Sequence, residues 1–98
     1  MDGDTLRVVV DLGFDTTTRQ YIRLKGIDCP EMDTPEGKRA RKFVETLLEG
    51  VAYLTLKTTR SDKYDRYLGD VTIPKKDGTY LYLNNELLTS RNAVRVRE

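Results

Sequence analysis

Two segments in the first third of the chain have the hydrophobic patterns of β-strands. Residues 5–12 are rich in β-branched side chains, and after a turn of Gly, Phe, Asp and Thr, apolar and polar residues alternate over residues 19–27. This pattern predicts a β-hairpin. Because neighbouring side chains on a strand point to opposite faces, Arg23 is expected on the face opposite to Ile22 and Leu24.

The next periodic segment has the spacing of an amphipathic helix. Thr34 and Pro35 suit the cap and the first position of a helix, and Gly50 suits its end. Between these signals an apolar stripe recurs every three or four residues and consists of Ala40, Phe43, Val44, Leu47 and Leu48. The sequence therefore predicts a helix over about residues 35–49 with one buried face.

Shorter strand patterns follow this helix. Residues 51–58 and 66–73 favour strands, and the polar residues 59–65 favour a loop between them. Residues 74–79 then favour a turn that leads into a short strand over residues 80–83.

The last predicted element is a short helix over about residues 84–91, capped by Asn84 or Asn85. Asn92 is expected to adopt the left-handed conformation that often ends a helix. Short strands with one long helix inserted among them indicate a mainly β, α+β fold, a small and partly closed β-barrel of the OB-fold kind. A length of 98 residues predicts a single domain over residues 1–98.

Composition excludes several classes of protein. The chain has no histidine, which rules out a Ser-His-Asp triad, a histidine zinc site and a histidine acid–base pair. Its single cysteine, Cys29, forms no internal disulfide, and no apolar run approaches the roughly 20 residues that cross a bilayer, so no membrane partner is expected. Residues 1–7 show no signal-peptide pattern, and the compartment is not predicted. A net charge of +1 means that an anionic partner must be held by locally placed charges.

Three carboxylates flank the predicted hairpin. Asp4 stands before its first strand, and Asp28 and Glu31 follow its second. Because an antiparallel hairpin returns the chain to its starting end, we expect the three to meet and to bind a hard cation such as Ca²⁺ or Mg²⁺. The alternative is that Asp4 and Asp28 are turn formers and Glu31 is a solvated loop charge.

Two arginines are candidates for binding phosphate. Arg23 lies shortly before Asp28, and Arg66 follows the polar loop. Guanidinium groups bind phosphate oxygens bidentately, so two of them facing a metal would hold a phosphodiester as its charge rises in the transition state. In the alternative interpretation, either arginine is a surface charge or pairs with Asp28 or Asp70.

Four segments together resemble one known family. They are DGDT at residues 2–5, RLKGIDCPE at residues 23–31, SDKYDR at residues 61–66 and LNNELL at residues 83–88. Their order and spacing resemble those of the thermonuclease, or staphylococcal nuclease-like, family. The resemblance implies an OB-like five-stranded barrel and a Ca²⁺-dependent endonuclease that hydrolyses single-stranded or frayed DNA and RNA to 3′-phosphate products.

The same resemblance implies roles for residues at the end of the hairpin. Asp4 and Asp28 match the family's side-chain ligands of Ca²⁺, and Cys29 matches a third ligand that uses its backbone carbonyl, so its thiol has no implied role. Glu31 matches the residue that orients and deprotonates the attacking water, a task open to a carboxylate.

Further roles fall on residues that bind the substrate. Arg23 and Arg66 match the pair that stabilises charge on the phosphate, and Lys63 and Tyr64 match the residues that hold a neighbouring phosphate. Asp65 stands where the family usually has glycine, and we expect its negative charge to reduce activity.

Other functions stay open beside the nuclease. The family's first strand normally precedes the DGDT segment and its last helix follows the matched region, so we expect residues 1–98 to lack both and to self-associate through an exposed strand edge. OB-like barrels also bind single-stranded nucleic acid without cleaving it, and a catalytically weak or inactive binding module is the alternative function. A domain that recognises peptides by adding a strand to its edge is a third possibility.

Overall fold

The computed structural model describes residues 3–61 and 67–97, which form a mainly β fold with two helices. In chain order its elements are β1 (Thr5–Asp11), β2 (Thr17–Leu24), β3 (Ile27–Asp28), α1 (Pro35–Leu48), β4 (Thr55–Ser61), β5 (Tyr67–Pro74), β6 (Tyr80–Tyr82), α2 (Leu83–Thr89) and β7 (Val94–Arg95). The predicted α+β class, with one long and one short helix, is confirmed. In the described ranges no helix combines the length and the apolar character needed to cross a membrane.

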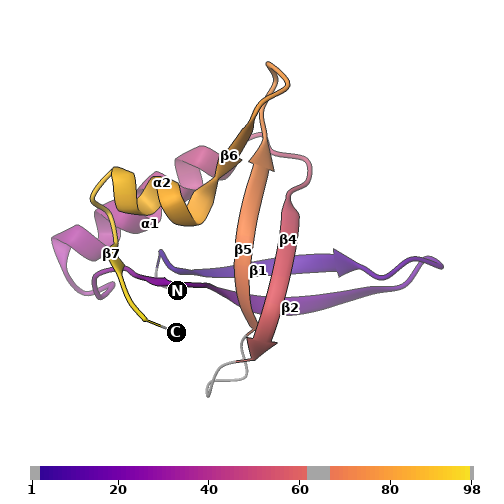
Figure 1. Cartoon of the computed structure of the whole chain (residues 1–98), viewed down its shortest axis with the longest axis horizontal. Helices are drawn as coiled ribbons and strands as arrows, with labels where there is room; N and C mark the ends of the chain where they lie inside the picture. The colour runs from indigo at the N-terminus through magenta and orange to yellow at the C-terminus, as the bar shows by residue number, and fades with distance from the viewer. Residues whose placement is uncertain (1–2, 62–66, 98) are drawn as a thin grey trace.

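The main sheet is an open, OB-like arrangement. Its strands lie in the order β1-β2-β5-β4, and β6 pairs with β5. β1 and β2 form the predicted antiparallel hairpin, whereas β2 and β5 run parallel. Figure 1 shows β1 and β2 running across β5 and β4, so the sheet turns sharply between the two pairs. Among the described residues, β1 and β4 each have a strand neighbour on one side only, which leaves the sheet unclosed.

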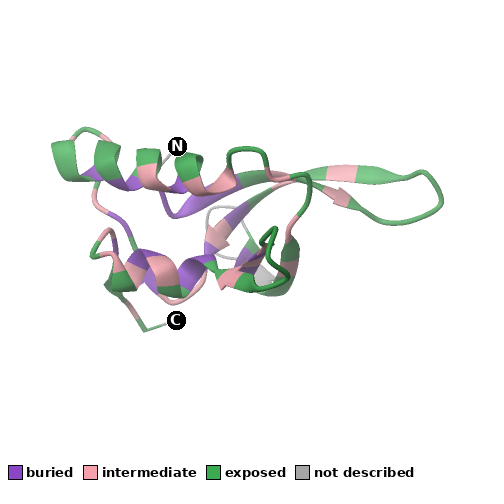
Figure 2. Ribbon diagram, turned by 90° about the horizontal axis from the view of Figure 1, so that it is seen from above, coloured by how far each residue is buried: buried purple, intermediate pink, exposed green. Residues whose placement is uncertain are grey.

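The hydrophobic core lies between the two helices and the inner part of the sheet. Ala40 and Val44 of α1 are buried in one cluster with Leu24, Val71 and Leu87. Figure 2 shows the buried faces of α1 and α2 turned toward one another, while the tip of the β1–β2 hairpin projects away and is exposed. The predicted buried stripe of α1 is therefore confirmed.

Helix α1 begins and ends close to its predicted limits. Thr34 is extended, with φ −102°, and its Oγ1 accepts the backbone N–H of Gly37 at 3.0 Å, which satisfies one of the free donors of the first turn. Pro35 occupies the first helical position, where its missing N–H costs no hydrogen bond. The helix stops at Leu48, and Gly50 then takes the left-handed conformation, with φ +74°.

Strand β4 begins later than predicted. Val51 and Leu54 belong to the expected strand, but they pack against the core from the connection between α1 and β4. Their apolar character therefore reflects burial rather than strand pairing. The strand also runs on to Ser61, inside the segment predicted as a loop.

Helix α2 starts differently from the prediction. Tyr82 is its cap, and no side chain caps the helix, so the prediction that Asn84 or Asn85 would do so is wrong. The residue that adopts the left-handed backbone after the helix is Arg91, with φ 64°, and not Asn92.

Asn84 is buried and joins three segments of the chain. Its Oδ1 accepts the backbone N–H of Val71 in β5 at 3.0 Å. Its Nδ2 donates to the carbonyls of Lys25 and Gly69, each at 3.0 Å. The side chain thus connects α2 to β5 and to the turn after β2 through hydrogen bonds to their backbone groups.

Candidate nuclease site at the end of the hairpin

Asp4 lies at the inner end of the hairpin and is almost completely buried, with 3% of its surface exposed. Its carbonyl accepts the backbone N–H of Leu24 at 2.7 Å, so the hydrogen bonding of β1 to β2 continues one residue beyond the start of β1. This bond fixes Asp4 opposite the last residue of β2. The hairpin therefore brings Asp4 to the segment that carries Cys29 and Asp28, as the sequence predicted.

Arg23 lies between two of the predicted carboxylates. Its Nη2 is 3.5 Å from Oδ1 of Asp28 and 3.9 Å from Oδ2 of Asp4. Its Nη1 donates to the carbonyl of Leu24 at 3.4 Å, and its side chain is only 15% exposed. The pairing with Asp28 was one of the alternatives considered for this arginine, and it occurs together with the contact to Asp4.

The carboxyl group of Asp4 is in an unfavourable place for a negative charge. Burial is the largest effect and raises its pKa above the usual value, and the nearby Asp28 raises it further. The backbone N–H of Cys29, which donates to Oδ2 of Asp4 at 3.2 Å, and the guanidinium of Arg23 lower the pKa but do not offset the rise. Burial therefore makes the ionised form of Asp4 less favourable than it would be in water.

The available ligands fit a hard divalent cation. Asp4 and Asp28 supply carboxylate oxygens, whereas the backbone group of Cys29 that contacts Asp4 is an N–H donor and not a metal ligand. Oxygen ligands of this kind suit Ca²⁺, and a second positive charge would relieve the repulsion between the two aspartates. Asp28 is 55% exposed at its side chain, which gives solvent access to the pair from outside.

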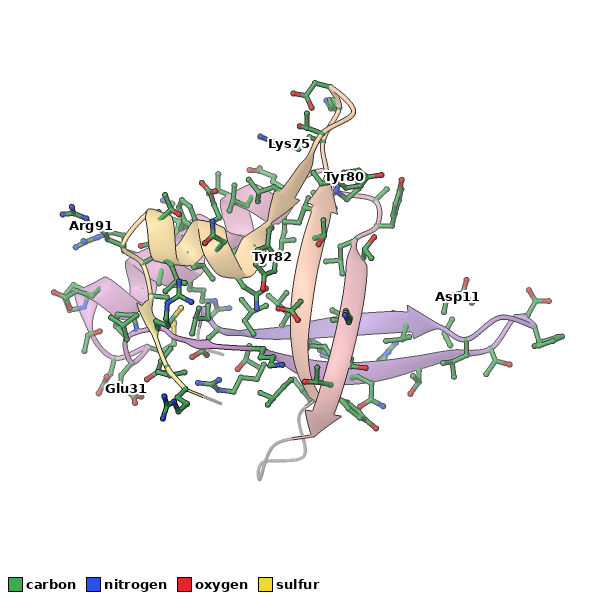
Figure 3. The ribbon with its side chains drawn as sticks, viewed as in Figure 1. Asp11, Glu31, Lys75, Tyr80, Tyr82 and Arg91 are labelled. Carbon is green, nitrogen blue, oxygen red and sulfur yellow. The ribbon has the colours of Figure 1, made fainter. Side chains whose placement is uncertain are left out.

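Glu31 does not join this pair. Across residues 3–61 and 67–97, no three Asp, Glu, His or Cys side chains lie close enough together to hold one metal ion. Glu31 is exposed on the loop that precedes α1 (Figure 3), and its carbonyl accepts the N–H and the hydroxyl of Thr34 at 3.0 Å and 2.6 Å. The expectation that all three carboxylates would meet is therefore wrong for Glu31, because the cap of α1 holds its backbone in the loop.

The backbone of Glu31 is also held by a contact that the sequence analysis missed. A Cβ atom at Gly37 would lie 1.9 Å from the carbonyl oxygen of Glu31 and 2.8 Å from that of Pro30. Any side chain at position 37 would push this loop away from α1. The available signal was a glycine in the first turn of the predicted helix, where glycine is otherwise unfavourable.

The remaining predicted site residues are not described by the structure. Lys63, Tyr64 and Arg66 lie outside the described ranges, as does Asp65. Asp70, named as a possible partner of Arg66, accepts a hydrogen bond from the hydroxyl of Tyr82. Burial, followed by this bond to Asp70, raises the pKa of Tyr82 to about 12.

Two comparisons with known proteins found similar sequences. A family model described as staphylococcal nuclease homologue matches residues 21–96, which include Arg23, Asp28 and Glu31. An uncharacterized 38.1 kDa protein from Capnoides sempervirens is 37% identical in a 73-residue alignment that covers 64% of this chain and 21% of that protein. The chain therefore spans about a fifth of the length of that relative. Because the family model covers well over half of the sequence, the chain belongs to the staphylococcal nuclease homologue family.

Proposed function

We propose that the chain is a Ca²⁺-dependent nuclease that hydrolyses single-stranded or frayed DNA and RNA to 3′-phosphate products. The observation that carries this proposal is the arrangement of Asp4 and Asp28 around the guanidinium of Arg23 at the end of the hairpin. Membership of a family with a nuclease fold, generally dependent on Ca²⁺, supports it.

The metal would be held by oxygen atoms from both ends of the hairpin. Asp4 and Asp28 would contribute carboxylate oxygens, and Cys29 its carbonyl. When bound, Ca²⁺ polarises a phosphoryl oxygen and stabilises the negative charge that develops on the phosphate.

Arg23 would bind the scissile phosphate. Its guanidinium is mostly buried and is held by contacts to Asp28 and to the carbonyl of Leu24, so it is oriented before the substrate arrives. A guanidinium presents two parallel donors to phosphate oxygens, and these bonds strengthen as charge develops. Arg66 is proposed as the second such group; Tyr67, its neighbour in sequence, pairs with Ile22, the neighbour of Arg23.

Glu31 would accept the proton of the attacking water. Its side chain is exposed and reaches solvent directly, which is what a group that takes up the proton of a water molecule requires. The water oxygen would form a bond to phosphorus as the bond to the 5′ oxygen breaks. The 5′ oxygen would take up a proton from solvent water and leave as a hydroxyl, and the phosphate would stay on the 3′ side. Lys63 and Tyr64 are proposed to hold the neighbouring phosphate.

One observation favours the alternative of a binding module that cleaves weakly or not at all. Glu31 is not gathered with Asp4 and Asp28, so the proposed base is separate from the proposed metal ligands. Such a module would still bind single-stranded nucleic acid through Arg23 and through aromatic and basic groups of the sheet.

Digestion of a labelled single-stranded DNA and a matched RNA tests the proposal. We expect cleavage with Ca²⁺, none after chelation, and 3′-phosphate ends that a phosphatase removes. Glu31→Gln and Arg23→Lys should each lower the rate at least about 100-fold, whereas Glu49→Gln, a change of the same kind at an exposed residue, should not. Cleavage that persists in chelator would refute the calcium mechanism, and binding without cleavage in the parent chain would establish the binding module instead.

A further inference from the structure

Within residues 3–61 and 67–97, β1 has a strand neighbour on its β2 side only, so its other side is a sheet edge. In the antiparallel hairpin, Asp4 and Leu24 form a hydrogen-bonded pair, and so do Leu12 and Thr16 at the other end. Asp4 and Leu12, which flank β1, are both even-numbered. Along an antiparallel ladder every second residue belongs to a hydrogen-bonded pair. The even-numbered residues of β1 therefore direct their backbone groups toward β2, and the odd-numbered residues direct theirs outward.

Arg7, Val9 and Asp11 are the odd-numbered residues in the centre and outer half of this edge. All three are exposed, and Val9 is 64% exposed. Side chains two apart on a strand share a face, so the three form a row with a positive charge, an apolar centre and a negative charge. Figure 3 shows Asp11 near the far end of β1, away from both helices. One oxygen of its carboxylate accepts the N–H of Gly13 at 2.8 Å, which orients the group.

A groove of about 620 Å³ runs along the same edge. Its wall on the strand side includes Val8 and Val10, and the opposite wall includes Leu48, Val51 and Leu54. These five side chains are half-buried rather than covered. The edge thus combines outward backbone groups with an apolar trough beside them, which is the form of a site that accepts an extended strand.

We propose that β1 pairs antiparallel with β1 of a second copy of this chain, with the two-fold axis at Val9. In that register Arg7 lies opposite Asp11 of the partner subunit, and Asp11 lies opposite Arg7 of the partner subunit. The three outward residues form hydrogen-bonded pairs across the interface. On the groove face, Val8 lies opposite Val10 of the partner subunit, so each strand covers part of the apolar trough of the other.

The charges select this register and this partner. Moving the axis to Arg7 places two arginines opposite one another, and moving it to Asp11 places two aspartates together, both of which are unfavourable. Moving the axis by a single residue, to Val8 or Val10, places Val9 opposite a charged residue of the partner subunit. The sequence around Val9 is thus complementary to itself in antiparallel pairing, which is what a closed two-fold interface requires.

Sedimentation of charge variants tests the dimer. The parent chain should reach twice the 11.3 kDa mass of one chain as its concentration rises. Arg7→Asp and Asp11→Arg should each weaken association roughly tenfold or more, because two attractive pairs become repulsive. The double variant Arg7→Asp/Asp11→Arg should restore it, and Lys76→Asp, an equal change of charge in the turn before β6, should leave it unchanged. A parent chain that stays monomeric, or a double variant no better than the single ones, would overturn the proposal.

A proline at the axis provides a second test. Val9→Pro removes an outward N–H but no hydrogen bond to β2, so circular dichroism should show a folded chain that sediments as a monomer. Val10→Pro removes an N–H that faces β2 and should damage the hairpin itself. If folded Val9→Pro still dimerises, the interface does not use this edge.

Discussion

Replacing Asn84 by alanine removes the side chain that joins α2 to the sheet. Asn84 is 2% exposed, and three hydrogen bonds are lost with it. Gly69 keeps a partner because its carbonyl also accepts the N–H of Lys25 at 2.9 Å. The N–H of Val71, which Asn84 accepts at 3.0 Å, is buried and loses this acceptor.

The cost of this change follows from the kind of bond that is lost. A neutral hydrogen bond contributes about 1 kcal/mol net, and a buried donor left without a partner costs about 1–3 kcal/mol. We therefore expect Asn84→Ala to lower the free energy of unfolding by about 3 kcal/mol. A domain of this size has a total of roughly 5–15 kcal/mol, so the variant should lose a large part of it. The melting temperature should fall by about 12–24 °C.

Urea unfolding followed by circular dichroism measures this cost, with Asn85→Ala as the matched control. Asn85 is exposed on the same helix, so its replacement should change the free energy of unfolding by no more than about 0.5 kcal/mol. The dependence of the free energy on urea should be the same in all three chains, because the surface exposed on unfolding does not change. An Asn84→Ala variant as stable as the parent, or a control that loses equally, would show that these bonds do not hold α2 to the sheet.

Three further predictions concern the loop, the tyrosine and the metal. Gly37→Ala should cost about 1–3 kcal/mol in urea unfolding, because its Cβ would overlap the carbonyl of Glu31; unchanged stability would contradict the contact. Folding raises the pKa of Tyr82 from 10.0 to about 12, so its protonated hydroxyl stabilises the folded state. This contribution to the free energy of unfolding is complete below pH 10 and is lost as the pH rises through 12. Tyrosinate absorbance should show one late-titrating group that disappears in Tyr82→Phe and moves to lower pH in Asp70→Asn; six groups titrating together would refute it. Saturating Ca²⁺ should raise the melting temperature, because a ligand at 100 times its dissociation constant adds about 2.7 kcal/mol to the free energy of unfolding. The rise should be smaller in Asp28→Asn, and equal rises in both chains would show that Asp28 is not a ligand.

The elements with strong local patterns could be predicted from the sequence alone. The hairpin follows from period-two alternation, and the start of α1 follows from Thr34 and Pro35, because a cap and a first turn involve only neighbouring residues. The hairpin in turn fixes Asp4 near Asp28, since an antiparallel return determines which residues face one another. This is why a contact between residues far apart in sequence was predictable.

Features that depend on distant contacts could not be read from the sequence in this way. Asparagine is a residue type that often caps helices, but the hydrogen-bond partners of the Asn84 side chain lie on β5 and after β2, and no local pattern reveals them. Asn tolerates the left-handed backbone better than arginine does, yet Arg91 adopts it, because the N–H groups of Asn92 and Ala93 both bond to the carbonyl of Leu87. In both cases the tertiary structure overrides the preference of a single residue.

The candidate site therefore combines residues from two parts of the chain, the β1–β2 hairpin and the loop that leads into α1, and each part is positioned by its own contacts. Asp4 and Arg23 are positioned by the hydrogen-bonded ladder of the hairpin, whereas Glu31 is positioned by the cap of α1 and by its contact with Gly37. The two parts meet where the loop after β3 enters the helix. A small movement of α1 relative to the hairpin would change the distance from Glu31 to the aspartates without breaking either part. The distance from Glu31 to the two aspartates is thus set by how α1 packs against the hairpin, and not by either part alone.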